Sequence, residues 1–141
     1  MIVQEVLTAK GSDVVTIEPG ASVKDAADLL TRHNIGAVPV MNGGSIVGIL
    51  SERDIVRQLA HQGASVLART VAESMTPNPF TGTPSTSVNE LMERMTERRI
   101  RHIPIVEGGK LLGLVSIGDV VKWKIEEAQQ EAASLRDYIA S

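Results

Sequence analysis

The feature that most constrains this chain is an internal duplication. When residues 14–59 are laid on residues 79–124 at a fixed offset of 65, thirteen positions are identical and no gap is needed. Most of the other apolar residues of the first copy stand opposite an apolar residue of the second. Two copies are fewer than a solenoid needs, so we expect them to pack against each other as one unit. The identical pairs are Thr16/Thr81, Pro19/Pro84, Ser22/Ser87, Val23/Val88, Thr31/Thr96, Ile35/Ile100, Pro39/Pro104, Gly43/Gly108, Gly44/Gly109, Gly48/Gly113, Ser51/Ser116, Asp54/Asp119 and Val56/Val121.

Within each copy, hydrophobic period and turn residues predict the element order β-α-β-β-α. Residues 14–17 are a β-branched run that ends at a Pro-Gly turn signal. The Ser-Val-Lys-Asp of residues 22–25 has the pattern of a capping box and opens a helix. Strands are predicted at residues 36–41 and 46–50 around a Gly-Gly turn, and a second helix at residues 52–61. The expected fold class is therefore α+β, with two tandem repeats whose small sheets pack against helices, plus a long C-terminal helix.

The duplication also predicts the domain organisation. We assign repeat 1 to residues 3–62, a short linker to residues 63–72, repeat 2 to residues 73–124 and a helical extension to residues 125–141. The last helix has an apolar stripe with a period near 3.5, which is typical of a seam between helices. Either the helix packs back onto its own module or it forms a helix–helix contact in a homodimer. The stripe consists of Val121, Ile125, Ala128, Ala132, Leu135 and Ile139.

Composition restricts the classes of function. A hydrophobic content of 43% and a charged content of 22% are those of a soluble globular protein. An aromatic content of 2% and a net charge of −3 argue against a nucleic-acid partner. With no cysteine, no membrane-length apolar run and no signal-peptide pattern at the start, we expect a cytoplasmic protein without disulfides. The sequence has no Gly-rich phosphate loop, nucleophile–base pair or metal cluster, so we expect neither an enzyme nor a metal site.

A short phrase that occurs once in each copy is the candidate for chemistry. The pattern Gly-apolar-apolar-Ser-x-x-Asp fills residues 48–54 and returns at residues 113–119. Each phrase brings a hydroxyl and a carboxylate to the first turn of a helix, which is the arrangement of a capping box. The free N–H groups of a helix N-terminus also attract anions. From the residues alone, the two phrases could be helix caps, a ligand site or both.

Together these features resemble a known family. Two β-α-β-β-α copies, each with an apolar-Pro-apolar strand and a Ser-x-x-Asp phrase, are similar to a pair of cystathionine-β-synthase-type (CBS) domains, also called a Bateman module. The resemblance covers roughly residues 3–124. It implies an adenine-nucleotide ligand (AMP, ADP, ATP or NAD) in the clefts between the copies. It further implies a regulatory ligand sensor, in which binding shifts the conformation of a homodimer that a separate protein reads.

The resemblance also implies site residues by position. Asp54 and Asp119 would accept hydrogen bonds from the ribose hydroxyls, while Ser51 and Ser116 would bond the sugar or phosphate. The backbone of the two Pro-containing strands would meet the adenine, and the segments that lead into each copy would line the opposite wall. The remaining candidate residues are Thr8, Lys10, Ala37, Val38, Pro39, Arg53, Met75, Thr76, Arg101, His102, Ile103 and Pro104.

The two sites differ in charge. Arg101 and His102 stand where the first copy has Gly36 and Ala37, and family members often place basic residues there to meet phosphates. We therefore expect the Asp119 site to be the stronger one for phosphates, although Arg53 lies in the phrase of the first copy. The alternative function is a structural dimerisation or protein-interaction module with empty or vestigial pockets.

Overall fold

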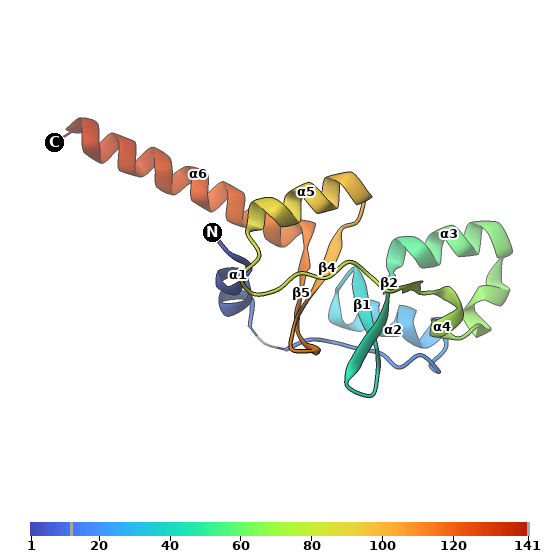
Figure 1. Ribbon diagram of the computed structural model, residues 1–141. Coiled ribbons are helices and arrows are strands. Elements are labelled where there is room, and N and C mark those ends of the chain that lie inside the picture. The colour runs from blue at the N-terminus through green and yellow to red at the C-terminus, as the bar shows by residue number, and fades with distance from the viewer. Residues whose placement is uncertain (12, 141) are drawn as a thin grey trace.

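The computed structural model describes residues 1–11 and 13–140. Figure 1 shows two small sheets, each with its own helices, and a long helix that leaves the body at the C-terminus. The α+β class with two tandem repeats is confirmed. The elements are α1 (Val3–Lys10), α2 (Val23–His33), β1 (Ala37–Asn42), β2 (Ser45–Ser51), α3 (Glu52–Gln62), the 3-10 helix η1 (Ala64–Ala68), α4 (Val71–Ser74), β3 (Thr76–Pro77), α5 (Val88–Arg98), β4 (His102–Glu107), β5 (Lys110–Ser116) and α6 (Ile117–Ala140).

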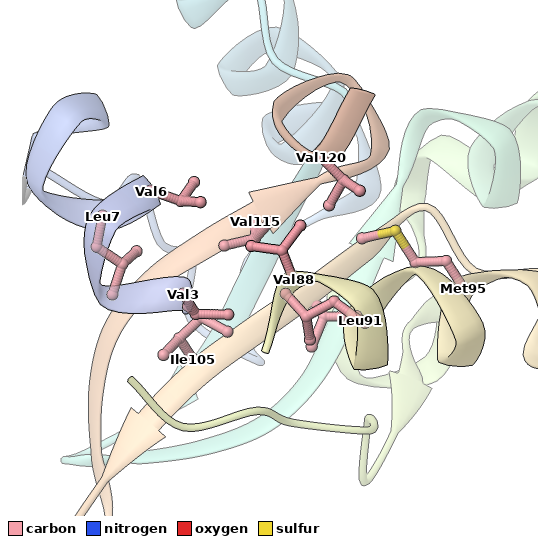
Figure 2. Packing of buried hydrophobic residues seen from close by; sticks show 10 residues of the cluster. Val3, Val6, Leu7, Val88, Leu91, Met95, Ile105, Val115 and Val120 are labelled. Carbon is pink, nitrogen blue, oxygen red and sulfur yellow. The ribbon is translucent and has the colours of Figure 1, made fainter. Parts of the chain in front are cut away.

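The chain forms two hydrophobic cores, one in each copy. Each core also includes a short helix that precedes the other copy in the sequence. In the second core, shown in Figure 2, Val3, Val6 and Leu7 of α1 pack with residues of β4, β5, α5 and α6. The N–H of Val3 donates to the carbonyl of Thr86 at 2.9 Å. Helix α4 is the counterpart of α1 and packs on the first core, where the N–H of Val71 donates to the carbonyl of Ala21 at 2.8 Å. The chain must therefore pass between the copies after α1 and again after α4.

Each copy has an antiparallel hairpin with the same irregularity. β1 pairs with β2 and β4 pairs with β5, and the register shifts after Val40 in the first hairpin and after Ile105 in the second. The short β3 extends the first sheet beside β2. Gly43 and Gly108 open the hairpin turns with φ of 64° and 58°, a conformation that glycine adopts without a steric penalty.

The strand expected at residues 14–17 is reduced to a single bridge, and two prolines explain why. Ile17 donates to the carbonyl of Pro39 at 3.1 Å and accepts from the N–H of Met41 at 2.9 Å, which completes one parallel bridge. A further hydrogen bond on the N-terminal side of this bridge would need an N–H at Pro39, and one on the C-terminal side would need an N–H at Pro19. Proline has no N–H, so the ladder stops at one bridge. The second copy repeats the arrangement at Gly82, between Pro104 and Pro84.

The capping boxes predicted from the sequence are confirmed. The Ser22 hydroxyl accepts from the N–H of Asp25 at 3.0 Å, and the Asp25 carboxylate accepts from the N–H of Ser22. Ser51 and Asp54 make the same reciprocal pair at the start of α3. Ser87 caps α5 by accepting from the N–H of Glu90 at 3.0 Å.

Helix α6 is 24 residues long, and its C-terminal half projects beyond the rest of the protein in Figure 1. Its apolar stripe is exposed: Val121 is 51% accessible, Leu135 61% and Ile139 80%. At the base of the helix, an apolar groove of about 320 Å³ lies between α5 and α6. Among the described residues, no helix is both long enough and apolar enough to cross a membrane.

Candidate functional site

A single cleft of about 950 Å³ is lined by residues of both copies and contains parts of both Ser-x-x-Asp phrases. It is bordered by the segments that pass between the copies, around Asp13 and Val14 in one case and Asn78 and Pro79 in the other. The cleft thus joins parts of the chain that the sequence keeps about 65 residues apart. The sequence-predicted candidates that line it are Lys10, Ala37, Ser51, Arg53, Asp54, Thr76, Arg101, His102 and Ser116.

The other predicted residues lie elsewhere around this cleft. Val38 and Ile103 are fully buried in the two cores, on the strands behind the cleft wall, and Pro39 and Pro104 beside them are buried too. The Thr8 hydroxyl donates to the carbonyl of Gln4, one turn earlier in α1. The last two candidates are Met75, which packs against the first core, and Asp119, which is ion-paired to the cleft residue Lys10.

In the first copy, Ser51 and Asp54 form a tight hydrogen-bonded unit at the start of α3. One carboxylate oxygen, Oδ2 of Asp54, accepts from the N–H of Ser51 at 3.1 Å and from its hydroxyl at 2.9 Å. The Ser51 hydroxyl oxygen in turn accepts from the N–H of Asp54 at 3.1 Å. The other oxygen, Oδ1, lies 3.7 Å from Nη1 of the exposed Arg57, a long contact that solvent weakens. Asp54 lines the cleft, and among the described residues its Oδ1 has no hydrogen bond shorter than this contact.

In the second copy, the equivalent carboxylate is engaged by a cation from the start of the chain. Oδ2 of Asp119 accepts from the N–H of Ser116 at 2.9 Å and from Nζ of Lys10 at 2.7 Å. Lys10 also donates to the carbonyl of Leu114 at 2.6 Å. Burial raises the pKa of Asp119, but the hydrogen bonds from Lys10 and Ser116 outweigh burial and hold that pKa below its ordinary value. The two phrases are thus alike as helix caps, but only the Asp119 carboxylate is bonded by a lysine at short distance.

His102 lies at the boundary between the copies. A side chain at Gly36 would meet its ring, with a Cβ only 3.2 Å from Nε2, so the glycine leaves room for the imidazole. Burial lowers the pKa of His102, and the positive charge of Lys10 lowers it further, against the opposing effects of Glu52 and Asp119. The imidazole is therefore neutral near pH 7 and can both donate and accept a hydrogen bond.

Glycines in β2 and β5 allow the crossing segments to approach the sheets closely. A Cβ at Gly113 would lie 2.5 Å from Cδ2 of Leu7, and a Cβ at Gly48 would lie 2.9 Å from the carbonyl oxygen of Thr76. Thr76 belongs to β3, which pairs with β2 opposite Ile49. The two glycines therefore let the crossing segments lie against the strands, and Leu7 and Thr76 both line the cleft.

Three arginines that line the cleft were not predicted from the sequence: Arg57 on α3 and two at the end of α5. Arg98 and Arg99 end α5, and a cationic helix C-terminus is ordinarily a solvated position. In the structure both line the cleft, and the guanidinium of Arg98 lies 5.0 Å from the centre of the Phe80 ring, which follows the crossing segment. The Arg-Arg-Ile-Arg run of residues 98–101 was the available signal, because it leads directly into β4 and its predicted site residues.

Comparison with known proteins decides the family. The sequence profile of the CBS domain matches residues 3–61 and again residues 68–126, so two matches cover most of the chain. The chain belongs to the CBS domain family. This CBS pair is 40% identical over 123 residues to the mitochondrial CBS domain-containing protein CBSX3 of Arabidopsis thaliana. The match covers 84% of this chain and 60% of that relative, so the CBS pair spans less than two thirds of its length.

Solved structures of CBS proteins resemble this CBS pair throughout. The CBS-domain protein ATU1752 from Agrobacterium tumefaciens is 44% identical, with a TM-score of 0.85 over 88% of this chain and 99% of that one. PAE2072 from Pyrobaculum aerophilum, complexed with AMP, is 26% identical, with a TM-score of 0.75 over 84% and 89% of the two chains. The CBS pair of MJ0100, in complex with 5-methylthioadenosine and S-adenosyl-L-methionine, is 26% identical, with a TM-score of 0.80 over 90% and 98%. The resemblance deduced from the duplicated phrases is confirmed.

Proposed function

We propose that this CBS pair is a regulatory module that binds an adenine nucleotide in the cleft between its two copies. The candidate ligands are AMP, ADP, ATP and NAD. The observation that carries the proposal is the single cleft that gathers acceptors from one phrase, a hydroxyl from the other and several basic side chains. Two similar CBS structures hold adenosine-bearing ligands, which supports a ligand of the same chemical class here.

The roles follow from the chemistry of each group. The free oxygen of Asp54 accepts from a ribose hydroxyl, and Ser51 bonds the sugar or the phosphate. In the second copy, Asp119 and Ser116 act in the same way once Lys10 moves from the carboxylate to a phosphate. Backbone groups of β1 and β4, at Ala37 and around His102, contact the adenine. The other predicted residues of those strands support the cleft wall from the buried side.

Binding would be read out as a change in how the copies sit on each other. A ligand in this cleft touches both copies and both crossing segments, so it stabilises one relative arrangement over others. The His102 ring, which occupies the space that a side chain at Gly36 would need, is part of this boundary. The regulated partner would be a separate protein or a further part of a longer chain. The proposal involves no nucleic acid and no membrane.

We further propose that the module works as a homodimer. The groove between α5 and α6 is almost wholly apolar, and Met92, Val121 and Ile125 remain exposed around it. A two-fold partner can cover such a face with the same face of its own, which is the commonest arrangement in homo-oligomers. The stripe along α6 continues the same apolar surface beyond the body of the protein.

A thermal-shift screen with AMP, ADP, ATP and NAD tests the nucleotide proposal. A ligand at a hundred times its dissociation constant stabilises the native state by about 2.7 kcal/mol, so at least one nucleotide should raise the unfolding midpoint clearly. The Asp54→Ala, Asp119→Ala double variant should lose that rise. If none of the four moves the midpoint of the wild type at millimolar concentration, nucleotide binding is refuted.

The second candidate function is a structural dimerisation module with unused pockets. One observation favours it: both phrases already satisfy helix N-termini, and Lys10 already satisfies Asp119. This alternative predicts a stable dimer together with an unchanged midpoint for every nucleotide, so the same screen separates the two functions.

A further inference from the structure

The lining of the cleft has an excess of positive charge, although the whole chain is negatively charged. The whole chain has a net charge of −3. The cleft is lined by six cationic side chains and only three carboxylates, an excess of three positive charges. Counting Asp119 against its partner Lys10 still leaves an excess of two. The cations are Lys10, Arg53, Arg57, Arg98, Arg99 and Arg101.

Most of these cations have no carboxylate partner of their own. Within the described residues, the guanidinium groups of Arg53, Arg99 and Arg101 make neither a hydrogen bond nor an ion pair. In the described part of the chain, the charged interactions of the other two are the position of Arg98 over the face of Phe80 and the long contact of Arg57 to Asp54. A positive lining that the protein leaves uncompensated favours an anionic ligand with more than one charge.

The backbone conformation at Arg99 is a second observation about the cations of the cleft. Arg99 ends α5 in the left-handed conformation with φ of 54°, which asparagine and glycine adopt more readily than arginine. The equivalent position in the first copy is Asn34, with φ of 53°. The second copy therefore has a long cation at a position whose backbone favours a short residue, and this cation lines the cleft.

We infer that the cleft selects adenine nucleotides with two or more phosphates over AMP, and disfavours a cationic adenosine compound such as S-adenosylmethionine. This inference rests on the proposed nucleotide binding and specifies its ligand class. Each further phosphate brings oxygens that a guanidinium can bond in bidentate fashion, and three guanidinium groups are uncommitted. A sulfonium ligand brings a positive charge to a lining that already has an excess of them.

Calorimetric titration of the full chain tests the inference, with ATP, ADP, AMP, S-adenosylmethionine and inorganic tripolyphosphate compared at one ionic strength and without divalent cations. We expect ATP and ADP to bind at least about tenfold more tightly than AMP, which one added charge-assisted contact supplies. S-adenosylmethionine should bind more weakly than AMP. Tripolyphosphate should bind more weakly than ATP, because it lacks the adenosine.

Single substitutions make the test specific. Arg101→Gln and Arg53→Gln should each weaken ATP binding more than AMP binding. Arg32→Gln is the matched control, because Arg32 is exposed on α2 outside the cleft and should leave both affinities unchanged. Unfolding midpoints of the variants confirm that the fold is intact.

The possible failures are distinct. AMP binding as tightly as ATP, or S-adenosylmethionine binding best, overturns the selection for polyphosphates but leaves nucleotide binding in place. If tripolyphosphate binds as tightly as ATP, the adenosine contributes nothing to binding. The assignment of the ligand as a nucleotide is then overturned, and the cleft is a site for free polyphosphate. Equal losses for ATP and AMP in Arg101→Gln also contradict the inference. If no adenine compound binds, the proposed function fails as well.

Discussion

Replacing Gly48 by alanine should destabilise this protein, while the same change at Gly113 should be nearly neutral. The two glycines are equivalent in the duplication, and both are buried in the strand that leads to a Ser-x-x-Asp phrase. A methyl group at Gly113 meets only the end of Leu7, with Cδ2 at 2.5 Å and the next atom, Cγ, at 3.8 Å. A methyl group at Gly48 meets Sδ and Cγ of Met75 and also the carbonyl oxygen of Thr76 at 2.9 Å.

The difference in neighbours sets the size of the effect. Overpacking a buried site costs about 1–3 kcal/mol, with the upper part of the range where backbone must move. Alanine regains about 0.5–1 kcal/mol relative to glycine in a strand through lower backbone entropy in the unfolded state. At Gly48 the obstacle includes backbone paired in the sheet, so the net loss should be about 1–2 kcal/mol. At Gly113 the Leu7 side chain can rotate, so the two terms should cancel to within about 0.5 kcal/mol.

Urea unfolding of the full chain at one protein concentration measures both variants. Each variant is the control for the other, since the added methyl group and the strand position are the same. The Gly48→Ala midpoint should also fall by roughly 3–8 °C in a thermal scan. Equal destabilisation of the two variants, or a larger loss in Gly113→Ala, would refute the assigned packing of the crossing segments.

Three other predictions concern charge, pH and assembly. In Lys10→Met, the Asp119 carboxyl should titrate at higher pH by carbon NMR, because the hydrogen bond that holds its pKa down is gone; an unchanged titration would contradict the ion pair. Because burial and Lys10 lower the pKa of His102, the unfolded state binds its proton first as pH falls below about 6.5. The free energy of unfolding of the wild type therefore falls as pH drops from about 6.5 to 5. It should fall less in His102→Gln, and equal falls in the two proteins would contradict this prediction. Truncation after Lys124 should weaken the homodimer without unfolding the module, as measured by light scattering; a monomeric mass for the full chain at micromolar concentration would remove the dimer proposal.

The features that the sequence predicted correctly are local or repeated. The capping boxes need only residues three apart, and the hairpin turns need only adjacent glycines, so their patterns are readable without tertiary contacts. The duplication adds the family, because Ser-x-x-Asp phrases at equal offset with Pro39 and Pro104 in register are too regular for chance. The fold class follows from these elements together.

What the sequence did not predict depends on contacts between distant segments. Lys10 lies 109 positions from Asp119, and no local pattern shows that its ammonium group engages that carboxylate. Arg99 looks like an ordinary cationic helix end until the crossing segment is placed beside it. The strand expected at residues 14–17 was wrong in extent, since further pairing needs N–H groups at Pro39 of the partner strand and at Pro19 of the segment itself.

A crystal structure of this protein grown with ATP would test the central claim most directly. We predict density for a nucleotide in the cleft between the copies, with a ribose hydroxyl within hydrogen-bonding distance of the Asp54 or Asp119 carboxylate and phosphates near Arg53, Arg99 or Arg101. A cleft that stays empty at saturating ATP, or a nucleotide bound elsewhere on the surface, would contradict it.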